Sequence, residues 1–132
     1  MASIFSKIVN GEIPSHKIAE SDDFLAFLDA FPIAFGHTLV IPKKEVDYLF
    51  DLDDDTYSRL LLFAKSIVPA LEKTVPCIRI GVSVIGLEVP HAHIHLLPLN
   101  SMGDADFSKK IKISQEELAA LAIQIRENLQ GQ

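Results

Sequence analysis

Hydrophobic residues fall in five short segments of the chain, and turn-forming or polar residues separate them. These segments are residues 16–20, 24–28, 38–41, 77–85 and 90–98. Short apolar or alternating runs between turn signals predict β-strands. The turn-prone sequence 21–23 predicts a hairpin between the first two strands. Pro42 is expected to end the third strand because proline has no backbone N–H. We expect the last two strands to pair antiparallel.

Two longer segments carry apolar residues at the spacing of an α-helix. Residues 53–74 have such a stripe and begin with the acidic run Asp53-Asp54-Asp55, which a helix N-terminus favours. Pro69 lies inside this segment, so we expect a bend or an early end there. Residues 114–129 begin with Ser114 and Glu117 at the spacing of a capping box. Together the elements predict an α+β fold with a five-stranded antiparallel sheet and two helices.

Length, composition and charge narrow the classes of function. With 132 residues, 48% of them hydrophobic, the chain can form a single domain, residues 1–132, around one core. The formal net charge of −6 opposes binding to nucleic acid or to a membrane surface, but it allows a local pocket for one nucleotide. The chain shows neither the apolar region of a secretory signal nor a run long enough for a membrane span, so we expect a cytoplasmic location. The single cysteine, Cys77, is expected to be a packed thiol.

Three of the five histidines occur at alternate positions, His91, His93 and His95, in the last predicted strand. Side chains alternate between the faces of a strand, so these three imidazoles would share one face and could converge on a metal ion or a phosphate. A phosphate would need N–H donors and one bare ring nitrogen as nucleophile. Catalytic zinc sites, by contrast, usually collect their histidines from more than one strand. We favour phosphoryl chemistry over a metal site, and both over histidines without a role.

The segment 91–97, His-Ala-His-Ile-His-Leu-Leu, resembles the signature of the histidine triad (HIT) family. Upstream, residues 4–8, 11–14, 25–29 and 36–43 resemble the N-terminal blocks of that family in the same order. The resemblance covers most of residues 3–98. It implies a homodimer that binds a purine nucleotide and hydrolyses or transfers nucleoside monophosphates through a covalent nucleotidyl-histidine.

The resemblance assigns roles to four histidines. His93, the middle residue of the triad, would be the nucleophile, because a neutral imidazole can attack phosphorus near neutral pH. A backbone carbonyl that accepts from its other nitrogen would fix which nitrogen is bare. His91 and His95 would flank the phosphate, and His37, from the loop before the third strand, would join them. Their N–H groups would stabilise charge on the phosphoryl oxygens. Without the resemblance, His37 fits equally well as a hydrogen-bonded histidine at a strand end.

The same resemblance places a nucleotide pocket. Asp29 would accept both ribose hydroxyls, a task that suits a carboxylate. The base and sugar would lie against Phe5, Ile8, Ile13, Phe27, Leu28, Ala30 and Leu39, although these positions also fit an ordinary core. Glu88 completes the set of predicted substrate-binding residues, in which it would orient a neighbour or face solvent. Zinc-binding relatives carry Cys-x-x-Cys where this chain has Ser3 and Ser6, so we expect no metal and no other cofactor.

The leading hypothesis is therefore a hydrolase of nucleoside 5′-phosphoramidates or related nucleoside monophosphate derivatives. The runner-up is a dinucleoside polyphosphate hydrolase, which would need extra room and positive charge beyond the α-phosphate. A hypothesis of another class is a module that binds a nucleotide or a metal without turnover. Replacing His93 by alanine separates these classes, because an enzyme would lose turnover and keep nucleotide binding.

Overall fold

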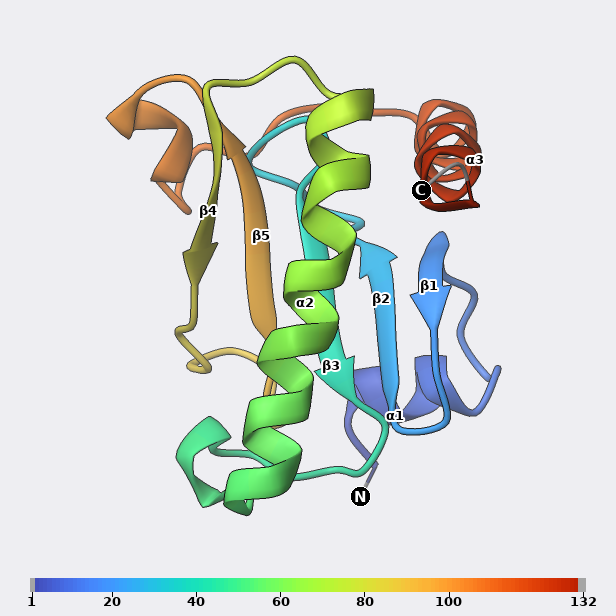
Figure 1. Ribbon diagram of the computed structural model, residues 1–132, viewed down its shortest axis with the longest axis vertical. Coiled ribbons are helices and arrows are strands. Elements are labelled where there is room, and N and C mark those ends of the chain that lie inside the picture. The colour runs from blue at the N-terminus through green and yellow to red at the C-terminus, as the bar shows by residue number, and fades with distance from the viewer. Residues whose placement is uncertain (1, 131–132) are drawn as a thin grey trace.

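Five strands and three α-helices form the part of the protein that the computed structural model describes, residues 2–130 (Figure 1). In chain order the elements are α1 (Ile4–Val9), β1 (Lys17–Glu20), β2 (Phe24–Leu28), β3 (Thr38–Pro42), the 3₁₀ helix η1 (Leu49–Asp51), α2 (Asp54–Thr74), β4 (Arg79–Ser83), β5 (Ile94–Leu99), the 3₁₀ helix η2 (Met102–Ala105) and α3 (Gln115–Gln130). Within residues 2–130 we find no helix that combines the length and the apolar character that a bilayer span requires.

The five strands form one antiparallel sheet in the order β1-β2-β3-β5-β4. The predicted hairpin is β1–β2, and the predicted antiparallel pair of late strands is β4–β5. Strand β3 extends one residue further than expected, because Pro42 still pairs with Phe24. Its missing N–H affects only the last position of the ladder. Strand β4 forms an edge of the sheet, next to the strand that carries His95.

Helix α2 is the longest element and begins as predicted, with the Asp53 side chain as its N-cap. The expectation of an early end at Pro69 is wrong, since α2 continues past this residue. Ile67, Ala70 and Leu71, on either side of the proline, are fully buried. Their packing stabilises the last turns of the helix although the proline leaves one helical carbonyl without its N–H partner.

Helix α3 begins at the predicted capping box. The backbone N–H of Ser114 donates to Glu117 Oε1 at 3.1 Å, and the N–H of Glu117 donates to Ser114 Oγ at 3.0 Å. The apolar stripe of α3 is buried against the sheet and α2, through Leu118, Leu121, Ala122 and Ile125. This packing confirms the predicted C-terminal helix.

The prediction of two helices is wrong, because α1 forms a third helix before the sheet. The Ser3 side chain caps it by accepting from the N–H of Ser6. Its buried residues are Phe5 and Ile8, one turn apart. A single pair of core residues in a six-residue helix is too little periodicity to recognise in the sequence.

The histidine strand also begins later than predicted, at Ile94 rather than at residue 90. The N–H of His91 donates to the carbonyl of Val89, and the N–H of Ala92 donates to the carbonyl of Val46. These donors are therefore not available to a neighbouring strand, and residues 91–93 approach β5 as an irregular segment.

Helices cover both faces of the sheet. Helices α2 and α3 pack on one face, and α1 packs on the other, which we call the α1 face (Figure 1). On the α1 face, Phe5 and Ile8 contact a second apolar cluster formed by Leu25, Phe27, Leu39 and Ile41. His95 lies opposite Leu39 in the β3–β5 ladder, so its side chain projects from the α1 face.

Candidate active site

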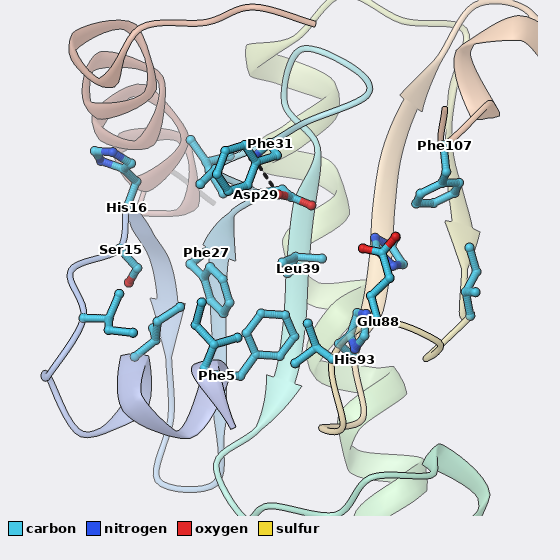
Figure 2. Close-up of a pocket in the computed structure, with 18 of the residues that line it drawn as sticks. Phe5, Ser15, His16, Phe27, Asp29, Phe31, Leu39, Glu88, His93 and Phe107 are labelled. Carbon is cyan, nitrogen blue, oxygen red and sulfur yellow. Dashed lines mark hydrogen bonds between the residues drawn. The ribbon is translucent and has the colours of Figure 1, made fainter. Parts of the chain in front are cut away.

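A cavity of about 640 Å³ opens on the α1 face. It is lined by all nine residues that were predicted to bind substrate: Phe5, Ile8, Ile13, Phe27, Leu28, Asp29, Ala30, Leu39 and Glu88. Figure 2 shows Asp29 and His93 on different sides of Leu39. Of the four predicted catalytic histidines, His93 and His95 line the cavity, whereas His37 and His91 are buried behind it.

His93 presents a bare ring nitrogen. Its Nδ1 lies 2.7 Å from the carbonyl oxygen of His91. A carbonyl only accepts, so Nδ1 carries the proton and donates it, and Nε2 of the neutral ring keeps a free lone pair. The ring of Phe5 packs edge-on against this imidazole, with 5.1 Å between the centroids, and fixes its orientation. The arrangement leaves a bare nitrogen on a residue of the cavity wall.

His95 presents the complementary group, an N–H. The backbone N–H of Ile33 donates to His37 Nδ1 at 3.2 Å, so the proton of neutral His37 is on Nε2. That nitrogen lies 2.8 Å from His95 Nδ1 and donates to it. The proton of His95 is therefore on its own Nε2. One backbone amide thus sets the tautomers of two histidines, and the pair ends in a hydrogen-bond donor.

His91 has no ring N–H left for a ligand. The ring is fully buried, with Nε2 at 2.8 Å from the carbonyl of Pro42 and Nδ1 at 2.8 Å from Ser3 Oγ. This differs from the expectation that a ring N–H of His91 would stabilise a phosphoryl oxygen. The physical reason is that both ring nitrogens already contact protein groups. What His91 offers the site is its main-chain carbonyl, which binds His93.

Burial favours the neutral form of His37, His91 and His95. Desolvation lowers the pKa of His37 to about 4 and the pKa of His95 to about 3. The positive charge of Lys110 acts in the same direction on both, and the Asp29 carboxylate acts in the opposite direction on His37. Burial also lowers the pKa of His91. The tautomers of His37, His91 and His95 described above belong to this neutral state.

Asp29 follows β2 and is oriented by a turn. Its Oδ1 accepts the backbone N–H of Phe31 at 2.8 Å, and its Oδ2 lies 3.5 Å from His37 Nε2. The side chain lines the cavity and is 17% exposed. Because each carboxylate oxygen has two acceptor sites, the group retains capacity for ligand hydroxyls.

Asp29, His37 and His95 also place their ligand atoms within 4.8 Å of one another, a spacing that a metal site could use. However, His37 Nε2 and His95 Nδ1 are 2.8 Å apart. Two nitrogen ligands of a tetrahedral zinc ion, with Zn–N distances of about 2.0–2.1 Å, lie roughly 3.3 Å apart. The shorter distance, and the proton on His37 Nε2, describe a hydrogen-bonded cluster and not a set of ligands around one ion.

A comparison with models of known protein families decides the family. The model of the HIT domain matches residues 10–102, a range that contains Asp29, His37 and the three triad histidines. The chain belongs to the histidine triad family. The resemblance seen in segment 91–97 is therefore confirmed at the level of the family.

Relatives of this histidine triad protein match it over most of its length. An uncharacterized HIT-like protein of Borreliella burgdorferi is 37% identical over 135 residues, with 96% of this chain and 97% of the relative covered. An adenosine 5′-monophosphoramidase of Saccharomyces cerevisiae is 34% identical over 131 residues, with coverages of 91% and 83%. The crystal structure of a Hit-like protein from Bartonella henselae has a TM-score of 0.82 at 34% identity and covers 96% of this chain and 95% of its own.

Among the cavity-lining residues of this histidine triad protein that were not predicted, three bear on the chemistry of the site. Phe31 is 74% exposed at the cavity, Phe107 packs edge-on against His95 with 4.8 Å between the centroids, and Lys110 adds a positive charge. The sequence gives a weak indication for Phe31, because the side chain of an aspartate often accepts the backbone N–H of the residue two positions later. Asp29 accepts the N–H of Phe31 in this way. Phe107 and Lys110 are distant in sequence and reach the site only through the fold.

Proposed function

We propose that this protein hydrolyses nucleoside 5′-phosphoramidates through a covalent nucleotidyl-His93 intermediate. The observation that carries the proposal is the pairing of a bare Nε2 on His93 with an N–H on His95, in rings whose centroids are 4.9 Å apart. The first group is a nucleophile, and the second is a donor for charge that develops on the phosphoryl group. Membership of the histidine triad family and the name of the yeast relative support the same class of reaction.

In the first step, the lone pair of His93 Nε2 forms a bond to the α-phosphorus while the P–N bond to the leaving amine breaks. The amine takes the electron pair of that bond and a proton from water. The N–H of His95 stabilises the phosphoryl oxygens, which is the main catalytic task when the transition state is loose. In the second step, the hydroxide derived from water bonds to phosphorus and the electron pair of the N–P bond returns to His93. The products are a nucleoside monophosphate and an amine, and one water is consumed.

The rest of the cavity supports a nucleoside as the group that is held. An apolar slot that includes Phe27 and Leu39 can bind a base by contact area, and the exposed ring of Phe31 lines the same cavity. We assign Asp29, whose carboxylate lines the cavity, as the acceptor of the ribose hydroxyls. A slot of this kind selects weakly among purines, so we assign a purine nucleotide as the substrate class without a choice between adenine and guanine.

One observation favours a second candidate, a dinucleoside polyphosphate hydrolase. Lys110 lines the cavity, and its charge acts on His37 and His95. A second phosphate beyond the α-phosphate would benefit from a positive charge at this end of the site. The two candidates share the His93 intermediate and differ only in the leaving group.

We also propose that the protein is a homodimer that uses the edge strand β4. Val82 pairs with Leu96, a residue of the core beneath α2, so Val82 lies on the α2 side of the sheet. It is 62% exposed, and Ile78, Val84 and Ile85 around it are exposed as well. An apolar edge strand is a surface that a second copy of the chain can cover by a two-fold interface.

The test is a panel of adenylyl and guanylyl phosphoramidates and dinucleoside polyphosphates, with product analysis and intact-mass detection of a nucleotidyl adduct. We expect turnover of a phosphoramidate, an adduct on the wild type, and neither in His93→Ala, which should still bind nucleotide. Imidazole added to His93→Gly should restore part of the activity, because it can occupy the space of the missing ring. Excess chelator should leave the activity unchanged. Turnover by His93→Ala would overturn the proposed nucleophile, and a wild type that binds nucleotides but cleaves none would be a binding module.

A further inference from the structure

A second group of polar side chains lies beside the triad and outside the cavity. Ser3 and Ser6 come from the start of α1, Glu45 from the loop after β3, and His91 from the segment before β5. Glu45 Oε1 accepts the backbone N–H of Ser3 at 2.6 Å and the hydroxyl of Ser6 at 2.7 Å. Ser3 Oγ lies 2.8 Å from His91 Nδ1. We call this group the Glu45 chain.

The available acceptors fix the direction of each hydrogen bond in the Glu45 chain. A carboxylate only accepts, so the hydroxyl proton of Ser6 goes to Glu45. The hydrogen bonds from Ser3 and Ser6 lower the pKa of Glu45 to about 2, so it is ionised at neutral pH. The carbonyl of Pro42 only accepts, so His91 Nε2, which lies 2.8 Å from it, carries the ring proton and Nδ1 of the neutral ring is bare. Ser3 Oγ, which accepts the N–H of Ser6 at 3.0 Å, therefore donates its own proton to His91 Nδ1.

The ring of His91 secures a piece of backbone that the sheet does not hold. Residues 91–93 precede β5, and their main chain is held by the contacts of His91 N–H with Val89 and of Ala92 N–H with Val46. The carbonyl of His91 is the acceptor for His93 Nδ1–H at 2.7 Å. If this peptide rotated, His93 would lose its acceptor, and its proton would be free to move to Nε2, the nitrogen that has to stay bare.

We propose that Ser3 and Glu45 are positioning residues of the active site, because the Glu45 chain holds the His91 carbonyl against His93 and thereby keeps His93 Nε2 free to react. The inference rests on the proposed role of His93 as nucleophile. Neither Ser3 nor Glu45 lines the cavity. Loss of the chain should therefore lower kcat and leave KM unchanged, since the surfaces that hold the nucleotide stay in place.

The experiment compares four variants with the wild type. Ser3→Ala removes the donor to His91 together with the N-cap of α1, and Ser3→Thr keeps a hydroxyl for both contacts and serves as the rescue. Glu45→Ala removes the acceptor and leaves the α1 cap in place, while Asp47→Ala removes the same charge from an exposed residue of the same loop. We expect kcat to fall roughly 10- to 100-fold in Ser3→Ala and about fivefold or more in Glu45→Ala, with KM changed less than about twofold. Ser3→Thr and Asp47→Ala should behave like the wild type.

The second measurement is the tautomer of each histidine, from two-bond ¹H–¹⁵N correlation spectra recorded without substrate. The wild type should show the proton of His93 on Nδ1 and that of His91 on Nε2, and Ser3→Ala should show His93 as a mixture of tautomers. The proposal is wrong if folded Ser3→Ala and Glu45→Ala keep the wild-type kcat and tautomers, or if KM rises while kcat is unchanged. If Ser3→Ala does not fold, Glu45→Ala decides. The two proposals can fail separately. If the wild type hydrolyses no substrate but the His93 tautomer still changes in Ser3→Ala, the proposed hydrolase activity is wrong and the proposed role of the Glu45 chain is supported.

Discussion

The buried pair His37–His95 should make the folded protein sensitive to mild acid. Burial lowers the pKa of His37 from an ordinary 6.5 to about 4. As the pH falls from neutral, the unfolded chain therefore binds a proton at this residue before the folded chain does. The contribution of neutral His37 to the free energy of unfolding is therefore fully present above pH 6.5. It is lost progressively as the pH falls towards the pKa of His37 in the folded protein.

The size of the effect follows from the shift. At pH 5 the unfolded chain holds roughly one more proton on His37 than the folded chain does. Integrating this difference in bound protons from pH 7 to pH 5 gives a decrease of about 2 kcal/mol in the free energy of unfolding. This is a large part of the stability of a small domain, which is about 5–15 kcal/mol. His95, with its own lowered pKa, adds to the loss in the same direction.

Urea unfolding at pH 8, 7, 6 and 5 measures the effect, and His37→Asn is the comparison. The amide oxygen of asparagine can still accept the N–H of Ile33, but the side chain does not titrate. Between pH 7 and pH 5 the wild type should lose about 2 kcal/mol more than the variant, and between pH 8 and pH 7 the two should change equally. Carboxylates such as Glu20 titrate in both proteins and cancel in the difference. Equal losses from pH 7 to pH 5 would refute the reasoning, because His37 would then take up its proton in the folded state at an ordinary pH.

Three further predictions concern packing, substrate and assembly. Gly36→Ala should lower the free energy of unfolding, measured in urea, by at least about 1–2 kcal/mol, because the residue has φ +90 and a Cβ would lie 2.9 Å from Val75 Cγ2. Gly86→Ala is the control, since Gly86 has a similar φ of +75 but open space around a Cβ. The difference between the two variants measures the cost of the contact with Val75. Asp29→Asn should raise KM about tenfold with little change in kcat and abolish the preference for ribose over dideoxyribose, and an unchanged KM would contradict the ribose contact. Val82→Lys should convert the proposed dimer to a monomer in light scattering after gel filtration, and a wild-type monomer would remove that proposal.

The sheet and the two long helices could be predicted because their apolar patterns are local. Helix α1 could not, since its burial rests on Phe5 and Ile8 alone. The start of β5 was misplaced for a different reason. Alternating histidines satisfy the pattern of a strand, but the amides of His91 and Ala92 donate to Val89 and Val46, and no local pattern shows where a backbone N–H donates.

The same limit applies to the site. The triad placed His93 and His95 correctly on one face together with the cavity, but it could not show that the ring of His91 is used up by protein contacts. That result depends on Ser3 and Pro42, which are 88 and 49 residues away in the sequence. Side-chain types in a motif predict which chemistry is available, whereas hydrogen-bond directions depend on partners that only the folded chain brings together.

Stability in acid and the chemistry of the site depend on the same protons. The 2.8 Å contact between His37 Nε2 and His95 Nδ1 is a hydrogen bond only while one of the two nitrogens is bare. If both rings were protonated, two N–H groups and two positive charges would face each other, and the contact would have to break. Burial lowers the pKa of both rings and therefore keeps the His95 N–H directed by its neighbours.

Substitutions that admit water to the His37–His95 pair should raise both pKa values and at the same time release the orientation of His95. Phe107→Ala removes the ring that packs on His95. This variant should therefore shift the acid limb of the pH–rate profile to higher pH. An acid limb that stays in place while the pKa of His95 rises in NMR titrations would separate the two effects and refute this link.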